Sequence, residues 1–254
     1  MAERLIEAAN LSAAWVEALS LIRPLPKHSA MHIVVRIADP GQEVAEIRAL
    51  ADQLLARGGV QPIDTVRNTI FPAAWAKRYA EPADLAAYYR EQYPTIRRIS
   101  RKNRRGTYFG RLVAYPDGET TIDQLSDRVT KLRSQKAGGH KSSMYEMNIW
   151  KPGDLPQGMG FPCMAFLSFH LDDDRLYLTA HYRNQFLTER AYGNYLGLAQ
   201  LQCYVAHAVG LTPAELMIVA GHATVDTPGK ANMTAIKALI EDAKPFVAST
   251  NEHP

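Results

Sequence analysis

One β-hairpin constrains the fold of this chain more than any other feature of its sequence. Residues 161–194 read FPCMAFLSFHLDDDRLYLTAHYRNQFLTERAYGN. Two runs in which apolar and polar residues alternate, 166–171 and 175–182, flank three consecutive aspartates. Alternation with a period of two predicts β-strands, and a short polar turn between two such runs predicts an antiparallel hairpin. We expect the rest of the chain to be organised around this hairpin.

The open end of the hairpin carries side chains that can do chemistry. Cys163 precedes the first strand, and Arg183 and Asn184 follow the second, so all three are expected at one end. A neighbouring cation lowers the pKa of a thiol and favours the nucleophilic thiolate. We therefore predict a lowered thiol pKa for Cys163 and an inert Cys203, which lies in an apolar run. Taken alone, a single cysteine in an apolar setting is more often a buried structural residue than a nucleophile.

Composition indicates an ordinary globular protein. The chain has 254 residues, of which 46% are hydrophobic and 22% charged, enough to bury one large core or two small ones. The two cysteines do not form a disulfide framework, which favours a reducing, cytoplasmic location. No signal-peptide pattern is present, and no uncharged apolar run reaches the length of about 18 residues that a membrane span needs.

The most basic segment is 96–105 (IRRISRKNRR), which carries six cations. Arg104 and Arg105 are candidates for phosphate binding, since guanidinium groups form paired hydrogen bonds with anion oxygens. A solvated surface is the alternative reading. Nucleic acid is a less favoured partner, because the aromatic residues of a single-strand binder are missing from the segment.

Periodicity predicts the remaining elements. Helical spacing of apolar residues, bounded by proline or glycine, predicts most of the helices. Runs rich in β-branched residues predict strands at 29–38 and 216–220, and segment 65–71 reads as a short strand or an extended loop. The predicted helices are 2–23, 43–57, 82–93 (ending before Pro94), 121–135, 191–209 and 230–243.

Several motifs together resemble the thymidylate synthase family. The hairpin supplies PCMAF at 162–166 and YRN at 182–184, followed by Asn194 before a long apolar helix. Their order and spacing are more specific than any single motif. The resemblance is strongest over residues 106–226. The supporting segments are GTYFG (106–110), IDQ (122–124), NIWKPGDL (148–155) and, more weakly, GHAT (221–224).

This resemblance implies a fold, a reaction and a set of roles. The fold is a single α/β (α+β) domain over residues 1–254, with a large mixed sheet backed by helices, and the protein is a homodimer. The reaction is one-carbon transfer to C5 of a dUMP-like pyrimidine nucleotide, with 5,10-methylene-tetrahydrofolate as the donor. Cys163 would attack C6, Arg183 would bind the phosphate, and Asn194 would read O4 and N3. Asn184 and Trp150 would also contact the substrate.

Departures from the family pattern keep a second function open. The family's general-base glutamate falls on Gln53 if the QLL match is right, its tyrosine falls on Phe109, and an aspartate is replaced by Phe186. These changes favour either a transferase with an altered substrate or a repurposed protein that binds a nucleotide or a partner without turnover. His222 and Asp226 are candidates for an acid–base pair, although a turn histidine is the simpler reading. No ligand spacing indicates a metal site.

Overall fold

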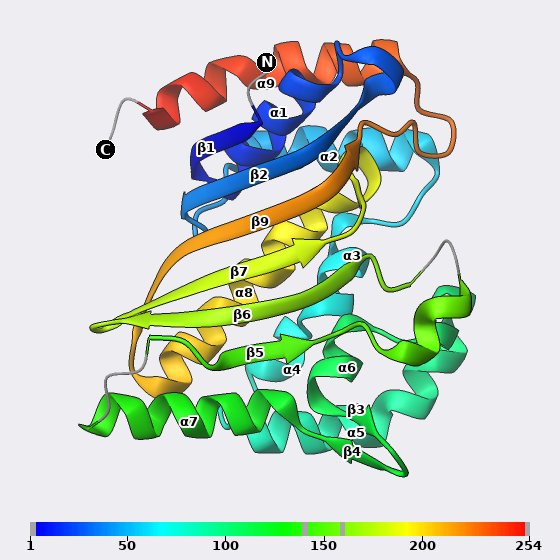
Figure 1. Cartoon of the computed structure of the whole chain (residues 1–254). Coiled ribbons are helices and arrows are strands. Elements are labelled where there is room, and N and C mark those ends of the chain that lie inside the picture. The colour runs from blue at the N-terminus through cyan, green and yellow to red at the C-terminus, as the bar shows by residue number, and fades with distance from the viewer. Residues whose placement is uncertain (1–3, 139–141, 158–160, 252–254) are drawn as a thin grey trace.

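The computed structural model describes residues 4–138, 142–157 and 161–251, and its centre is a seven-stranded mixed sheet (Figure 1). The strand order is β1-β2-β9-β7-β6-β5, with β8 paired to β9 beside this path. A small second sheet pairs β3 (Tyr115–Asp117) with β4 (Thr120–Ile122). The strands of the large sheet are β1 (Leu5–Asn10), β2 (Ser29–Asp39), β5 (Tyr145–Asn148), β6 (Met164–Asp172), β7 (Arg175–Tyr182), β8 (Gln185–Phe186) and β9 (Thr212–Thr224).

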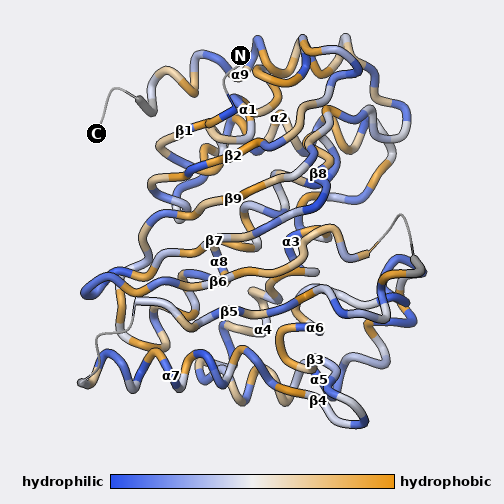
Figure 2. Tube along the Cα trace, viewed as in Figure 1, coloured by the Kyte–Doolittle hydropathy of each residue, from blue (hydrophilic) through white to orange (hydrophobic). Residues whose placement is uncertain are grey.

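Helices back this sheet, as the sequence predicts for an α/β protein. Figure 1 shows the strands in front of α8 and α3, and apolar residues recur along β9 and β6 in Figure 2. The α-helices are α1 (Leu11–Ile22), α2 (Ala45–Gly58), α3 (Ile63–Ile70), α4 (Ala73–Ala76), α5 (Pro82–Ile99), α6 (Tyr108–Val113), α7 (Gln124–Gly138), α8 (Tyr192–Val209) and α9 (Met233–Asn251). In the part of the chain that the structure describes, none of the helices could span a bilayer.

The predicted hairpin is confirmed as β6 and β7, which pair in antiparallel fashion. Phe169 faces Leu178 in this ladder, and both side chains are fully buried. Beyond its last rung, the backbone N–H of Arg183 donates to the carbonyl of Cys163 at 2.9 Å. The hairpin therefore brings Cys163 and Arg183 to the same end, as expected from the sequence.

Three predicted elements are wrong at the N-terminal half of the chain. The helix predicted for 2–23 begins instead as strand β1, and α1 starts after Asn10, whose side chain caps it by accepting from the N–H of Ala13 at 2.9 Å. The segment predicted as a strand or loop at 65–71 is helix α3 up to Ile70. Helix α5 continues past Pro94 to Ile99, so this proline does not end it.

Helices α3 and α8 approach each other at two glycines. A Cβ at Gly193 would lie 2.8 Å from the carbonyl oxygen of Ile63, and one at Gly197 would lie 3.0 Å from that of Arg67. The two glycines are four positions apart in the sequence, so both lie on one face of α8. The absence of two side chains thus lets the backbone of α3 come close to the start of α8.

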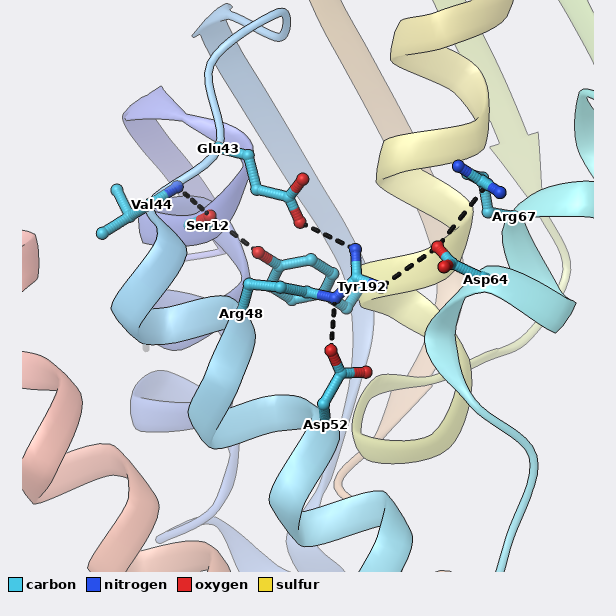
Figure 3. A network of polar contacts seen from close by, with 8 residues as sticks. All are labelled: Ser12, Glu43, Val44, Arg48, Asp52, Asp64, Arg67 and Tyr192. Atoms are coloured by element: carbon cyan, nitrogen blue, oxygen red, sulfur yellow. Dashed lines mark hydrogen bonds and ion pairs between the residues drawn. The ribbon is translucent and has the colours of Figure 1, made fainter. Parts of the chain in front are cut away.

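A polar network centred on Arg48 links helices that surround the start of α8 (Figure 3). Its guanidinium forms ion pairs with Glu43 at 3.1 Å, Asp52 at 2.7 Å and Asp64 at 3.0 Å. Asp64 belongs to α3, while Arg48 and Asp52 belong to α2. Beside it, the hydroxyl of Tyr192, the first residue of α8, hydrogen-bonds that of Ser12 in α1 at 2.9 Å. The beginning of α8 is therefore fixed against three other helices.

Gly193→Ala tests the close approach of α3 and α8. The added methyl group meets a backbone carbonyl, which cannot rotate away as a side chain can. We therefore expect the free energy of unfolding to fall by about 1–3 kcal/mol. Gly138→Ala is the matched control, because a Cβ there meets nothing within 4 Å. Alanine's higher helix propensity should raise stability at that site by up to about 1 kcal/mol. Equal effects of the two substitutions in urea unfolding would contradict the account.

Candidate functional site

A cavity of about 550 Å³ lies at the end of the hairpin that carries Cys163. Its wall is built from α3, the 3-10 helix η2 (Arg101–Arg105), β8, the π-helical turn η4 (Leu187–Ala191) and the start of α8. The lining residues are Val66, Thr69, Arg101, Lys102, Asn103, Arg105, Gly106, Thr107, Tyr108, Phe161, Cys163, Asn184, Gln185, Phe186, Glu189, Arg190 and Asn194.

Cys163 lies at the wall of this cavity, next to an irregularity in strand pairing. The β6–β7 register shifts between Met164 and Phe166, and the carbonyl of Ala165 accepts from two backbone N–H groups instead of continuing the ladder. Such bulges redirect the side chains beside them. Burial raises the pKa of the Cys163 thiol, and the positive charges of Arg183 and Arg190 lower it by less. The prediction of a net lowered thiol pKa is therefore wrong for the ligand-free protein, because desolvation outweighs the two cations.

Tyr108 supplies a hydroxyl beside the thiol. Burial raises the pKa of Tyr108, as does the neighbouring Cys163, while hydrogen bonds from the backbone of Met164 and Cys163 lower it by less. Phe109 takes the family's tyrosine position in the motif. Its side chain is fully buried and packs against Tyr89, with ring centroids 4.7 Å apart. The expectation that the hydroxyl is lost is thus wrong, since the preceding residue brings one into the cavity wall.

Arg183 lies beside the cavity rather than in its lining. The side chain is exposed, and its Nε donates to the carbonyl of Pro162 at 3.0 Å. Asn184, the next residue, does line the cavity, and its Oδ1 lies 2.6 Å from Nδ1 of His222. His222 therefore holds the asparagine side chain and does not pair with Asp226.

Two buried carboxamides line the cavity. Asn194 in the first turn of α8 is 5% exposed, and Gln185 on β8 is 2% exposed. Each carboxamide both donates and accepts hydrogen bonds. Together they can recognise a polar ring that presents its edges to the cavity wall.

Four cations surround the cavity, three of them from the basic segment. Helix η2 contributes Arg101, Lys102 and Arg105, and η4 contributes Arg190. Glu189 is the one carboxylate in the described lining, and it pairs with Arg190 at 2.7 Å and with Lys102 at 3.6 Å. The net charge of this wall is positive, which suits a ligand with phosphate oxygens.

Besides Arg183, His222 and Phe109, other residues singled out from the sequence also lie outside the described cavity lining. Arg104 is exposed on η2, and its carbonyl accepts from Arg97. Trp150 is 37% exposed, and its carbonyl accepts from Tyr115. The side chain of Asp226 accepts from the backbone N–H of Thr188 at 2.9 Å, so it stabilises the η4 turn. The remaining residue, Gln53, is exposed on α2.

The side of the cavity nearest α3 carries no carboxylate. Val66 and Thr69 are the two residues that this helix contributes. The match between Gln53 and the family's glutamate is therefore wrong, because α3 rather than α2 reaches the site. The candidate acid–base pair of His222 and Asp226 is not formed, since each side chain has a different partner. The hydrogen bond between His222 and Asn184 agrees with the simpler reading of a satisfied turn histidine.

A second cavity of about 560 Å³ adjoins the first. The two share Thr69, Lys102, Asn103, Thr107 and Arg190. The wall of the second cavity includes Trp75 and Tyr89 beside Pro72, Ile96 and Ile99. Two adjacent spaces of this size can hold two small molecules in contact with each other.

No cluster of three or more His, Cys, Asp or Glu side chains suited to a metal ion occurs among residues 4–138, 142–157 and 161–251. The polar groups of the described lining include the thiol, the carboxamides, the hydroxyl of Tyr108 and the cations named above.

Comparison with known proteins places these features in a family. The family model described as "Thymidylate synthase" matches residues 63–237, which is more than half of the chain and includes every residue of the cavity lining. The chain belongs to the thymidylate synthase family. Gln53 lies outside the matched region, in agreement with its place on α2.

Two relatives show how distant this member of the thymidylate synthase family is. A protein of Methanothermobacter thermautotrophicus named "Putative thymidylate synthase" is 30% identical over 112 residues, covering 44% of this chain and 47% of that protein. The "Thymidylate synthase" of Equine herpesvirus 2 is 26% identical over 180 residues, covering 69% of this chain and 55% of that protein. The chain thus spans about half the length of the curated relatives it matches.

Sequence analysis missed four polar lining residues. Tyr108 was overlooked because its neighbour Phe109 occupied the expected position in the motif. Gln185 directly follows the YRN motif and carries no charge to mark it. Glu189 and Arg190 are adjacent to each other in the segment between Arg183 and Asn194, where two charged residues in an apolar stretch were the available signal.

Thiol alkylation across pH tests the electrostatics of Cys163. In a Cys203→Ala background, the rate of iodoacetamide labelling should rise with a midpoint above the value of about 8.5 of an unperturbed cysteine. Arg183→Met should move the midpoint higher still, because it removes a charge that favours the thiolate. A midpoint below that of a free cysteine would show that the cations outweigh burial.

Proposed function

We propose that this protein transfers a one-carbon unit to C5 of a pyrimidine nucleotide through covalent catalysis by Cys163. The observation that carries the proposal is the cavity that combines Cys163, Tyr108 and Asn194 with four cations. A thiol supplies a nucleophile, a carboxamide a reader of the base, and cations a phosphate site. Membership of the thymidylate synthase family supports this combination.

The first steps follow from the chemistry of the ring. The sulfur of Cys163 forms a bond to C6, and the C5–C6 π electrons move toward O4, where Asn194 stabilises the developing negative charge by donating a hydrogen bond. C5 becomes nucleophilic toward an electrophilic carbon. Loss of the C5 proton then restores the C5–C6 double bond as the S–C6 bond breaks, and the electron pair returns to sulfur.

Phosphate recognition would come mainly from the basic segment. Arg105 was singled out from the sequence and lines the cavity, with Arg101 and Lys102 beside it. Arg183 would join them from the rim, next to Cys163. A phosphate bound there would be held close to the thiol by cations of one chain.

The second cavity fits a one-carbon donor with a flat ring system. Trp75 and Tyr89 give it aromatic walls, and Lys102 and Arg190 lie where it meets the first cavity. A bound 5,10-methylene-tetrahydrofolate would supply the electrophilic one-carbon unit, whose C–N bond to the folate would break on transfer. Hydride from the tetrahydrofolate would then complete a methyl group, whereas water in its place would give a hydroxymethyl group. The role of this chain would be to stack the donor ring and bring it against C5.

A second candidate function is nucleotide binding without turnover. The raised pKa of the Cys163 thiol favours it, and so does the lack of a carboxylate on the α3 side of the cavity. Such a protein would bind the nucleotide, or a protein partner, with the same residues. The two functions differ in whether a bond forms to Cys163.

We also propose a homodimer formed through the outer face of the sheet. His181 and Tyr177 on β7 and Met217 and Val219 on β9 are only partly buried on that face, and Phe166 is 36% exposed. Light scattering after size-exclusion chromatography should give twice the chain mass of 28.3 kDa. A strict monomer would contradict this proposal.

Incubation with 5-fluoro-dUMP tests the covalent mechanism. Fluorine at C5 cannot leave as a proton does, so the S–C6 bond should persist once the ring has reacted with the donor. Intact-mass analysis should show one nucleotide per chain in the presence of methylene-tetrahydrofolate, and none for Cys163→Ser. Binding of the nucleotide to wild type with no adduct, with and without the donor, would favour the binding function instead.

Substitution of Asn194 tests base recognition. Asn194→Asp replaces the amide donor by a carboxylate that accepts, so it should weaken dUMP binding and improve dCMP binding relative to wild type. A change of about 10-fold in the ratio of the two dissociation constants corresponds to one hydrogen bond. An unchanged ratio in isothermal titration calorimetry would show that Asn194 does not contact the base.

A further inference from the structure

The carboxamide of Gln185 is buried, and only its oxygen has a hydrogen-bond partner within the described part of the chain. Its Oε1 accepts a hydrogen bond from the hydroxyl of Tyr195 at 3.4 Å. Its Nε2 is buried and has no hydrogen-bond partner in the described part of the chain. An unpaired buried donor destabilises a folded protein, and most buried polar groups have partners. This one therefore calls for a partner from outside the chain.

The position of Gln185 indicates what that partner is. Gln185 lines the cavity together with Cys163 and Asn194. Strand β8 fixes its backbone, since Gln185 pairs with Ala223 of β9. The contact with Tyr195 holds the oxygen end of the amide. Gln185 is thus a residue of the cavity wall whose amide nitrogen has no partner in the described part of the chain, and a ligand oxygen that reached it would supply the missing acceptor.

We propose that Gln185 is a specificity-determining residue, whose Nε2 donates a hydrogen bond to O2 of the pyrimidine ring. The inference rests on the proposed function. A uracil ring has two carbonyl oxygens, and recognition of O4 and N3 by Asn194 leaves O2 for a second reader. Gln185 is the other buried carboxamide in the described lining, and its unpaired group is a donor, which matches a carbonyl.

Gln202 provides a matched control elsewhere in the core. It is also buried, and its Nε2 donates to the backbone carbonyls of Leu176 at 2.8 Å and Ala214 at 3.0 Å. Its Oε1 has no partner in the described part of the chain, so Gln202 matches Gln185 in having one unpaired end but differs in using its donor within the fold. This amide holds β7, β9 and α8 together and does not line the cavity. The two glutamines therefore separate a role in ligand recognition from a role in the fold.

The first experiment compares melting temperatures of the two variants without ligand. Both glutamine variants are made in a Tyr195→Phe background, which removes the hydroxyl that donates to Oε1 of Gln185. There Gln185→Met removes only an unpaired donor, so the melting temperature should stay unchanged or rise by about 2–4 °C. Gln202→Met leaves carbonyls unpaired and should lower it by at least as much. A fall for Gln185→Met equal to that of Gln202→Met would overturn the inference, because it would show that the fold itself uses the amide.

The second experiment measures binding of dUMP and 2-thio-dUMP by calorimetry. Sulfur at position 2 is a poor acceptor, so wild type should bind dUMP about tenfold more tightly than the thio analogue. Gln185→Met should lose this discrimination, with dUMP binding weakened by a similar factor. If Gln185→Met still bound dUMP more tightly than 2-thio-dUMP, the role of Gln185 would be overturned while the proposed function would stand. Failure of wild type to bind either nucleotide would instead overturn the proposed function, and the assignment to O2 with it.

Discussion

The pairing of β9 with strands on both of its sides is the constraint on which the rest of the structure depends. β9 joins β2 in antiparallel fashion and β7 in parallel fashion, so it connects the N-terminal strands to the hairpin. It also extends beyond the end of β7, because Tyr182 pairs with Ala220 while Gln185 pairs with Ala223. Arg183 and Asn184 form the short link between those two pairings, which is why they lie beside Cys163.

Burial and charge compete at the site that this pairing creates. Desolvation raises the pKa of the Cys163 thiol, and Arg183 and Arg190 offset part of that effect. Arg190 is itself paired with Glu189, so some of its charge is neutralised. A phosphate bound to the basic segment would redistribute these charges. Burial and charge therefore act on the Cys163 thiol in opposite directions, and an anion at the basic segment would shift the balance between them.

The sequence predicted the parts of the fold that local periodicity controls. The hairpin, the long helix α8 and the position of Cys163 beside Arg183 follow from alternation and spacing, and all three are present. Segment 65–71 was misread because tertiary packing against Gly193 and Gly197 makes it a helix, and a single sequence does not reveal that contact. Pro94 was expected to end α5, but the helix continues past it.

Lining residues that belong to a sequence motif could be predicted, whereas residues brought together from distant segments could not. Cys163, Asn184 and Asn194 line the cavity, and family resemblance had singled them out. Arg104 and Arg105 are adjacent in sequence, yet only Arg105 belongs to the described lining, because the turn of η2 directs neighbours differently. Glu189 and the unpaired amide of Gln185 became visible only in three dimensions.

Release of tritium from [5-³H]dUMP tests the central claim most directly, since it reports cleavage of the C5–hydrogen bond whatever group is finally transferred. The account predicts that wild type releases tritium to water with methylene-tetrahydrofolate present and that Cys163→Ser does not. No release by wild type, with or without the donor, from a nucleotide that calorimetry shows to be bound would contradict C5 chemistry at this cavity.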